Sequence, residues 1–216
     1  MAYAGPVETP EEITARFDGY APVYDASDMH RGLAKSVAAF IRSRGVHDVL
    51  DVGTGTGLLL RSLPLAPWRL VGVDLSPAML EIARAALPNA RFELADAARL
   101  DFPDASFDLV TCVTVLHLVP DATAAMREWH RVLRPGGRIV LATFADDDPS
   151  PIACGAASAR TIPLIDLHAP FGSPEALEQL AAAAGLVVDR IAEWRHEPVA
   201  DEPEYHFLIT EFSAAA

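Results

Sequence analysis

Three glycines at alternating positions follow a short apolar segment and form the most distinctive pattern in the chain. Residues 49–52 read Val-Leu-Asp-Val, and Gly53, Gly55 and Gly57 come next. Glycine permits a sharp backbone turn and allows a ligand to approach the main chain closely. The Gly-x-Gly-x-Gly spacing is one residue shorter than the Gly-x-Gly-x-x-Gly loop that holds a pyrophosphate. The segment is therefore either a ligand-binding loop or a plain turn between a strand and a helix.

Two aspartates end the next two apolar runs. Asp74 follows Leu70-Val71-Gly72-Val73, 17 residues beyond Gly57, and Asp96 follows the next run along the chain. In an open α/β sheet, ligands bind outside the carboxyl ends of the strands. There, Asp74 could accept two hydrogen bonds from a ribose diol, and Asp96 could accept one from an adenine amino group. Asp74 could instead cap the following helix, but Ser76 is better placed for that. With the glycines, the aspartates predict an adenosyl-binding site.

Apolar runs alternate with helical patterns along the chain. This alternation predicts an α/β fold with a mostly parallel sheet and helices on both faces. The expected strands are residues 48–52, 69–74, 91–95, 107–113, 138–144, 186–193 and 205–211, the last two paired as a hairpin. The expected helices are residues 32–44, 58–63 and 121–133, two that begin at Ser76-Pro77 and Ser173-Pro174, and a short one at 11–17. Pro135-Gly136-Gly137 is expected to separate a helix from the fifth strand.

Length, composition and charge limit the class of protein. The 216 residues are 51% hydrophobic, which fits one soluble domain over residues 1–216. The formal net charge of −13 argues against nucleic acid as the main partner. Cys112 and Cys154 are too far apart for a metal-binding knuckle and are typical of a reducing cytoplasm. The apolar runs are of strand length, so we expect no signal peptide and no membrane span.

The sequence resembles the class I methyltransferases that depend on S-adenosylmethionine, within their ubiquinone/menaquinone-biosynthesis-like branch, methyltransferase type 11. The resemblance covers about residues 20–144. It rests on the ordered segments VLDVGTGTG, GVDLSPAMLEIAR, LADAARLDFPDASFDLVTCVTVLHLV and HRVLRPGGRIVLATF. Many relatives have cysteine where this chain has Thr54. The resemblance implies a Rossmann-like seven-stranded sheet in the order 3-2-1-4-5-7-6, with the seventh strand antiparallel.

The resemblance also implies a role for individual residues toward the cofactor. The glycine loop, with Gly53, Thr54 and Gly55, would wrap the methionine part. Asp74 would hold the ribose. The remaining contacts implied by the resemblance are Leu75, Met79, Asp96 and Ala97 on the adenine, Cys112 or Val113 near the sulfonium, and Tyr20 from an N-terminal lead-in, residues 1–31, that folds over the cofactor.

Aromatic and imidazole side chains are the candidates nearest the reacting atoms. Tyr20 and Tyr24 could pack near a sulfonium by cation–π attraction, or could form a hydrophobic plug under the lead-in. His117, just past the fourth strand, is the best placed general base, and its ordinary pKa near 6.5 suits that role. The alternative is a structural histidine at the start of a helix. Asp146, Asp147 and Asp148 are expected in a solvated loop rather than in a metal site.

The acceptor is expected to be a small molecule methylated at O, N or C. It would lie between the lead-in and residues 145–172, whose apolar side chains favour an apolar or aromatic compound. The Asn/Asp-Pro-Pro-Tyr motif of amino-group methylation in nucleobases and glutamine is absent after the fourth strand. The expected assembly is a monomer or a homodimer.

Two other functions remain open at this point. An NAD-dependent oxidoreductase would need the longer glycine loop and a hydride-transfer set such as Tyr-x-x-x-Lys, and the only lysine is Lys35. A non-catalytic adenosyl-binding or regulatory protein would keep the same loop and aspartates without turnover.

Calorimetry with S-adenosylmethionine, its demethylated product and NAD separates these interpretations. We expect both adenosyl compounds to bind and NAD not to bind. Replacing Asp74 by alanine should cost roughly 1–3 kcal/mol of cofactor affinity if its carboxylate bonds the ribose. Binding of NAD alone would contradict the adenosylmethionine interpretation.

Overall fold

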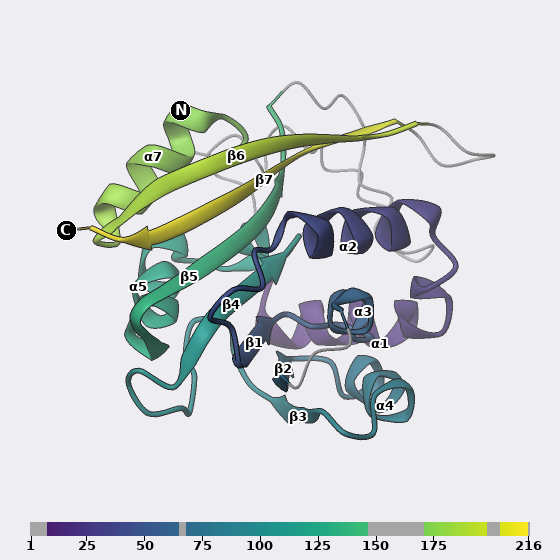
Figure 1. Cartoon of the computed structure of the whole chain (residues 1–216). Coiled ribbons are helices and arrows are strands. Elements are labelled where there is room, and N and C mark those ends of the chain that lie inside the picture. The colour runs from purple at the N-terminus through teal and green to yellow at the C-terminus, as the bar shows by residue number, and fades with distance from the viewer. Residues whose placement is uncertain (1–7, 65–67, 147–170, 198–203, 216) are drawn as a thin grey trace.

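The computed structural model describes residues 8–64, 68–146, 171–197 and 204–215. Its centre is a seven-stranded sheet in the order β3-β2-β1-β4-β5-β7-β6 (Figure 1). The strands are β1 (Asp48–Val52), β2 (Arg69–Asp74), β3 (Arg91–Leu94), β4 (Phe107–Val113), β5 (Leu133–Phe144), β6 (Leu186–His196) and β7 (Tyr205–Ala214). The first five run parallel, and β7 pairs antiparallel with both β5 and β6. The implied strand order and antiparallel seventh strand are confirmed.

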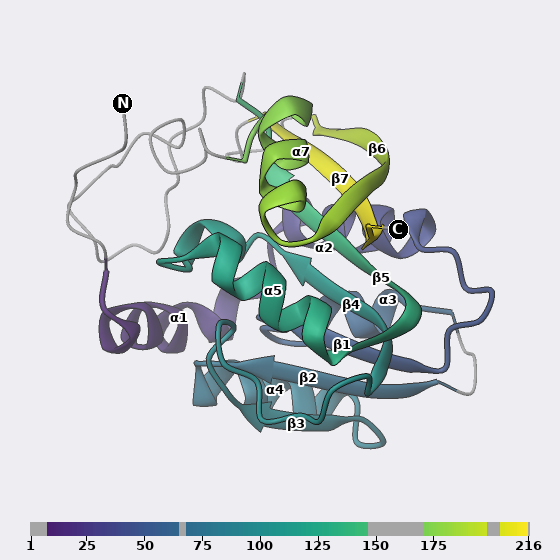
Figure 2. The same ribbon diagram turned by 90° about the vertical axis from the view of Figure 1, so that its left-hand side faces the viewer.

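Helices cover both faces of the sheet. They are α1 (Pro10–Tyr24), α2 (Asp28–Phe40), α3 (Leu58–Ser62), α4 (Pro77–Ala86), η1 (Leu116–Leu118), α5 (Ala122–Val132) and α7 (Pro174–Ala183). Figure 2 shows α5 and α7 in front of the sheet and α2, α3 and α4 behind it. Each side has its own buried core: Trp129 and Met126 of α5 fill one, and Leu33 and Val37 of α2 belong to the other. The two cores hold the sheet rigidly between them.

The order of the strands places one end of the sheet where a ligand can bind. From β1 the chain passes to β2 and β3 on one side, then returns to β4 and β5 on the other. The carboxyl ends of β1 and β4 therefore lie side by side at the switch point, where the loops that follow them diverge. Helix α1 crosses this end of the sheet (Figure 2).

The N-terminal helices differ from the sequence-based expectation. The short helix predicted at 11–17 is wrong in length, since α1 has 15 residues. A capping box in which Thr9 and Glu12 bond each other's backbone starts it, and this Thr-x-x-Glu signal was present in the sequence. Helix α2 starts at Asp28 rather than at residue 32, with Ser27 as its N-cap. Gly32 lies inside α2, where the absence of a side chain makes room for the Trp194 ring: a Cβ at this position would lie only 2.9 Å from it.

The Pro-Gly-Gly segment does not separate helix from strand. Helix α5 ends at Val132 and β5 begins at Leu133, so the expected start at residue 138 is wrong. The pairing of β4 with β5 shifts register between Phe107 and Leu109, which places Pro135-Gly136-Gly137 in a bulge within the strand. Gly136 has a φ of +80°, a conformation that glycine adopts at little cost. Pro135, Gly136 and Gly137 thus form a bend within β5 instead of preceding the strand.

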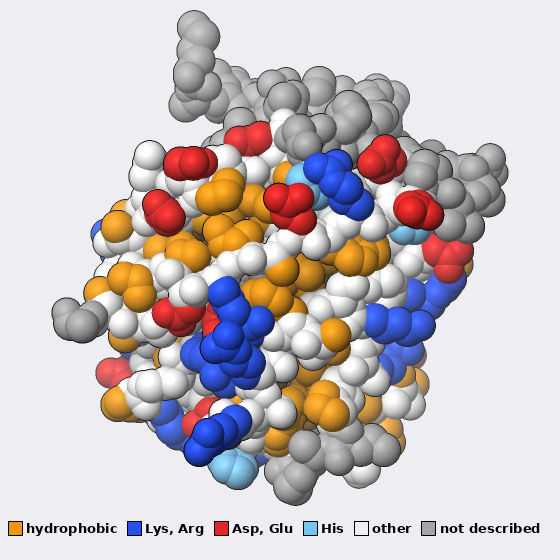
Figure 3. All heavy atoms as spheres, turned by 45° about the horizontal axis from the view of Figure 1, so that its top comes forward, with side chains coloured by type: hydrophobic (Ala, Val, Ile, Leu, Met, Phe, Trp, Pro, Cys, Tyr) orange, Lys and Arg blue, Asp and Glu red, His pale blue; other side chains and the backbone are white. Residues whose placement is uncertain are grey.

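The outer strand β6 has a mixed surface. Val187 is 44% exposed there, while Asp189, Glu193 and Arg195 alternate along the strand. Figure 3 shows hydrophobic side chains on the face seen from above β6, bordered by acidic and basic side chains. Charged side chains on an edge strand discourage edge-to-edge pairing with another sheet. None of the helices in the described part of the chain has the length and apolar character needed to cross a bilayer.

Candidate active site

A cavity of about 350 Å³ lies at the carboxyl ends of the central strands. This volume is within the usual range for small-molecule sites. Eleven of the residues singled out in the sequence analysis line it: Tyr20, Tyr24, Gly53, Gly55, Asp74, Leu75, Met79, Asp96, Ala97, Val113 and His117. The tertiary structure therefore gathers, in one place, side chains that are up to 97 residues apart in the chain.

Two glycines of the loop after β1 are needed for different structural reasons. Gly53 has a φ of +67°, and a Cβ there would lie 2.2 Å from the Val115 Cγ2 atom, so no larger residue fits. Gly55 has a φ of +54°, but its hypothetical Cβ would meet only the Met79 Sδ and Tyr24 Cε1 atoms, each at 4.0 Å. Both of these side chains line the cavity. A side chain at Gly55 would occupy the space that the loop leaves open for a ligand.

Asp74 connects the glycine loop to the end of β2. Its Oδ2 atom accepts a hydrogen bond from the Gly55 backbone N–H at 2.8 Å, and its Oδ1 atom accepts one from the Ser76 N–H at 2.9 Å. Burial raises the pKa of this carboxyl, and the backbone bonds oppose the rise. Each carboxylate oxygen has more than one acceptor site, so the group can accept two further bonds from a diol. Ser76 caps α4 by accepting from the Met79 N–H, as expected.

Asp96 and Ala97 form the wall of the cavity beyond β3. The Asp96 Oδ1 atom accepts a bond from the Ala98 N–H at 2.8 Å, which holds the side chain in a tight turn. The carboxylate retains acceptor capacity beyond this single bond. Asp74 and Asp96 thus follow neighbouring strands and line the same cavity.

Helix α1 covers the cavity and is fastened on both sides of it. The Asp18 carboxylate accepts from the Ser76 hydroxyl at 2.5 Å and from the Ala78 N–H at 3.1 Å, at the start of α4. Asp25 accepts from the Thr56 hydroxyl and from Arg61, each at 2.5 Å. These bonds tie the lead-in to the elements that carry the glycine loop and Asp74.

Three rings line the cavity next to this cover, Tyr20 and Tyr24 from α1 and His30 from α2. Tyr24 stacks on His30 with ring centroids 4.0 Å apart, and Tyr20 meets Tyr24 edge-on at 5.5 Å. The His30 Nδ1 atom lies 3.1 Å from the Tyr24 carbonyl oxygen. The electron-rich faces of such rings suit a cationic ligand. His30 belongs to this cluster through its ring contacts with Tyr20 and Tyr24.

Comparison with known proteins identifies the family. A model described as a methyltransferase domain matches residues 50–141. A demethylmenaquinone methyltransferase of Streptomyces griseus is 32% identical over 157 residues, which are 70% of this chain and 68% of that protein. Nocamycin O-methyltransferase of Saccharothrix syringae is 33% identical over 202 residues, 79% of this chain and 71% of that protein. The chain belongs to the class I methyltransferase family. Within this family the chain is similar to methyltransferases of the ubiquinone/menaquinone-biosynthesis branch.

The extent of the match differs among relatives. The demethylmenaquinone methyltransferase of Deinococcus radiodurans is 39% identical over 146 residues, and the chain spans 61% of that protein's length. A solved structure, the putative methyltransferase in complex with the Haloferax volcanii Trm112 activator, superimposes with a TM-score of 0.72. That structure covers 93% of this chain at 22% identity, so it supports the fold alone.

The donor used by class I methyltransferases is S-adenosylmethionine, and the residues of this cavity fit it. Gly55 leaves open the volume that a Cβ would fill. Asp74 and Asp96 offer carboxylate oxygens at the ends of β2 and β3. The rings of Tyr20 and Tyr24 are suited to a sulfonium cation.

Two of the residues implied by the resemblance lie outside this cavity. Cys112 is fully buried in the core, and burial raises the pKa of its thiol, so Val113 is the member of the pair that lines the cavity. The Thr54 side chain also points away from the cavity. Its Cγ2 methyl packs against Gly72 in the sheet, so closely that a Cβ at Gly72 would lie 2.8 Å from it. Thr54 lines a small neighbouring cavity instead. The two-residue period of a strand and the sharp turn of the loop determine which side chains reach the cavity.

The turn after β4 contains a strained residue. Thr114 has a φ of +56°, which is rare for a β-branched side chain. Its N–H donates to the Ala142 carbonyl at 2.9 Å, and its hydroxyl donates to the Val113 carbonyl at 2.8 Å. Thr114 and the following Val115 line the cavity, although sequence patterns did not single them out. Strain of this kind is concentrated at functional sites.

The histidines and tryptophans separate into two groups. His117 lies in η1, lines the cavity and meets Phe144 edge-on at 6.0 Å. His130 is near Gly185, away from the cavity. Trp129 and Trp194 are packing residues in the two cores. His168, Cys154, Asp147, Asp148 and most of the expected loop 145–172 lie outside the described residues. Within the described ranges, no group of three potential ligands could hold a metal ion.

Asp51 is a buried carboxyl group next to the glycine loop that sequence reasoning did not assign. It is 2% exposed and accepts a hydrogen bond from the Thr111 hydroxyl at 2.7 Å. Burial raises its pKa from the ordinary 3.8 to about 6. A folded-state pKa above the unfolded value means that ionisation destabilises the fold, so stability from this group is present below about pH 4 and lost as the pH rises to about 6.

Replacing Asp51 by asparagine should remove this pH dependence. The interval from 3.8 to about 6 corresponds to about 3 kcal/mol. We therefore expect the stability of the Asp51→Asn variant, relative to the wild type, to increase by up to about 3 kcal/mol between pH 4 and pH 7. Urea unfolding of both proteins across this range measures the difference. A difference that stays constant with pH would show that the Asp51 pKa is not raised.

Proposed function

We propose that this protein transfers a methyl group from S-adenosylmethionine to a small-molecule acceptor at O, N or C. The observation that carries the proposal is the convergence of the Gly55 opening, Asp74 and Asp96 on one cavity beneath the rings of α1. Each feature alone has a plain structural explanation. Their arrangement after three neighbouring strands supports an adenosyl site, and the family supports methyl transfer.

In this proposal each part of the donor has its own residues. Gly53 and Gly55 face the methionine part, Asp74 accepts from the ribose hydroxyls, and Asp96 accepts from the adenine amino group. The other proposed contacts are Leu75, Met79 and Ala97 around the adenine, and Tyr20 and Val113 toward the sulfonium. When bound, the donor supplies a methyl group that is already activated by a cationic sulfur. The protein's part is then alignment of donor and acceptor, a proximity effect that can account for much of the rate.

The acceptor side of the cavity is apolar. It is lined by η1 and the residue after it, by the last residue of β5 and by the first residue of β7, namely His117, Leu118, Val119, Phe144 and Tyr205. Among the described residues that line the cavity, none is lysine or arginine. A phosphate or carboxylate group on the acceptor would therefore find no lysine or arginine partner among these lining residues. These features favour an uncharged, apolar or aromatic acceptor.

His117 is proposed as the general base where the acceptor carries a proton that must leave. It shares the acceptor side of the cavity with Phe144, and imidazole accepts protons near neutral pH. A cytoplasmic location belongs to the same proposal and is supported by the two widely separated cysteines.

A second candidate is a protein of this fold without methyl transfer. The crystal structure of the [4+2]-cyclase SpnF superimposes on 89% of this chain with a TM-score of 0.68 at 21% identity. The fold therefore also occurs in a protein named for a cyclisation. Incubation with methyl-labelled S-adenosylmethionine and phenolic, hydroquinone and amine acceptors separates the two candidates. Transfer of label to any class supports methyltransferase activity, and tight donor binding without transfer to any class supports the second candidate.

Alanine at Gly55 tests the opening in the glycine loop. A Cβ there enters the cavity, so we expect at least a tenfold loss of S-adenosylmethionine affinity in calorimetry. The matched control is Gly45→Ala, because Gly45 has a φ of +77° and open space around it, away from the cavity. Both variants carry a similar backbone cost of roughly 1 kcal/mol. Equal donor affinity in the two variants would contradict the proposed position of the donor.

A double-mutant cycle isolates the ribose contact of Asp74 from its support of the Gly55 backbone. We expect removal of the 2′- or 3′-hydroxyl from S-adenosylhomocysteine to cost the wild type roughly 1–2 kcal/mol of binding free energy. In Asp74→Ala this cost should vanish, because the partner of the hydroxyl is gone. An undiminished cost in the variant would limit Asp74 to a structural role.

A further inference from the structure

The loop between β3 and β4 carries the adenine side of the proposed site but has little structure of its own. Asp96 and Ala97 line the cavity at its start. Within the loop, the Arg99 N–H donates to the Asp96 carbonyl at 3.0 Å, forming an isolated bridge. The position of the loop therefore depends on bonds to other elements, and helix α5 provides most of those in the described chain.

Trp129 connects the core of α5 directly to the cavity wall. Its side chain is fully buried, and its Nε1–H donates to the Ala97 carbonyl at 2.8 Å. Ala97 lines the cavity and directly follows Asp96. The indole thus places a rigid donor, held by close packing, against the backbone of the residue pair proposed to meet the adenine.

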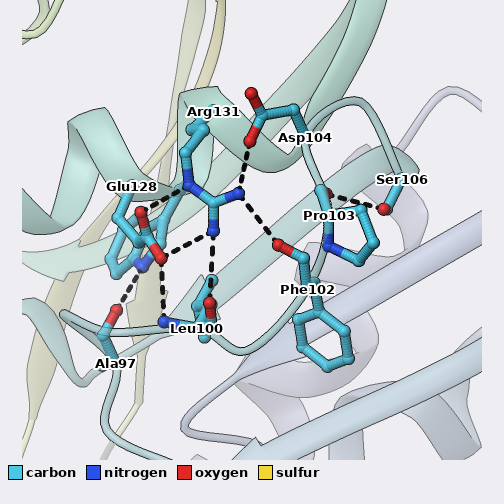
Figure 4. A network of polar contacts seen from close by, with 9 residues as sticks. Ala97, Leu100, Phe102, Pro103, Asp104, Ser106, Glu128 and Arg131 are labelled. Carbon is cyan, nitrogen blue, oxygen red and sulfur yellow. Dashed lines mark hydrogen bonds and ion pairs between the residues drawn. The ribbon is translucent and has the colours of Figure 1, made fainter.

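Arg131 holds the rest of the loop (Figure 4). Its guanidinium donates to the Leu100 carbonyl at 3.2 Å and to the Phe102 carbonyl at 2.8 Å. It also bonds Asp104 at 2.6 Å and both oxygens of Glu128 at 2.8 Å. Glu128 in turn accepts from the Leu100 N–H at 2.9 Å. The planar fork of arginine satisfies all these acceptors at once, which a lysine ammonium cannot do.

The pKa shifts of Glu128 and Arg131 agree with a fixed geometry of their hydrogen bonds. The hydrogen bonds from Arg131 lower the pKa of Glu128 below its ordinary value. The Glu128 and Asp104 partners raise the pKa of Arg131. Both groups therefore stay charged across the physiological pH range, in which the ion pair between Glu128 and Arg131 persists.

We propose that Trp129 and Arg131 are positioning residues that hold Asp96 and Ala97 against the purine of the donor and so set the preference for adenine. The inference rests on the proposed function, because it assumes an adenosyl ligand. Neither side chain lines the cavity, so both act through the loop. A hydrogen-bonding site of this kind rejects an analogue that lacks the matching group only while its polar atoms are held in place.

The test compares S-adenosylhomocysteine with its inosine analogue, in which a carbonyl oxygen replaces the adenine amino group. We expect the wild type to bind the adenine form at least tenfold more tightly, because the carbonyl would face Asp96 without a hydrogen to donate. In Trp129→Phe, which loses only the N–H and one ring, and in Arg131→Met, this preference should fall about tenfold. Arg131→Lys, which keeps the charge without the fork, should lose part of it.

Arg134→Met is the matched control. Arg134 also bonds two carboxylates, Asp48 at 2.6 Å and Asp108 at 2.8 Å, but these lie at the starting ends of β1 and β4, away from the cavity. This variant should keep the full preference for adenine. Thermal unfolding, followed by circular dichroism, identifies the temperature at which every variant is folded and can be compared.

The outcomes separate this inference from the proposed function. If the variants lose affinity for both ligands by the same factor, or keep the wild-type preference, the network supports stability alone and the inference is overturned. If Arg134→Met loses the preference equally, the effect is general and the inference is likewise overturned. If the wild type binds neither ligand, the adenosyl site and the proposed function fail with it.

Discussion

The carboxylate of Asp74 is the interaction on which the proposed site depends most. It accepts backbone hydrogen bonds from Gly55 and from Ser76, and so joins the loop after β1 to the turn that starts α4. Because the carboxylate is largely enclosed, these bonds stabilise its charge in a place where burial alone raises the pKa. One side chain thus shapes the glycine loop and presents acceptor oxygens to the cavity.

Two supports outside the sheet complete this arrangement. On one side, α1 is bonded through Asp18 to the start of α4 and through Asp25 to Thr56 and Arg61. On the other side, α5 is bonded through Trp129 and Arg131 to the loop after β3. The α5 support acts on a loop that has no ladder of its own, whereas the α1 support acts on the start of α4, on Thr56 of the glycine loop and on Arg61 of α3. In both places side chains from a helix form hydrogen bonds that hold an element next to the cavity, because the sheet itself orders only the strand ends.

Much of the fold followed from local patterns, and the errors have identifiable causes. The bounds of β1, β2 and β4 were predicted as observed, since apolar runs that end in polar or glycine residues have little alternative. The role of Pro135-Gly136-Gly137 was predicted wrongly because proline and glycine mark either a turn or a bulge. Only the pairing of β5 with β4 distinguishes the two. Helix α1 was underestimated because only Ile13 and Ala21 are buried along it, so its apolar period is weak.

The sequence by itself determined the class of fold, the family and the proposed adenosyl-contacting residues at the ends of strands, because these depend on local spacing. Only the tertiary structure decided that Val113 rather than Cys112 faces the cavity, and that Thr54 turns into the sheet. It also brought Phe144 and Tyr205 together with His117 along the wall of the cavity that we propose as the acceptor side. The physical reason is that the local residue pattern determines where a strand ends, whereas the direction of a side chain depends on which elements pack against it.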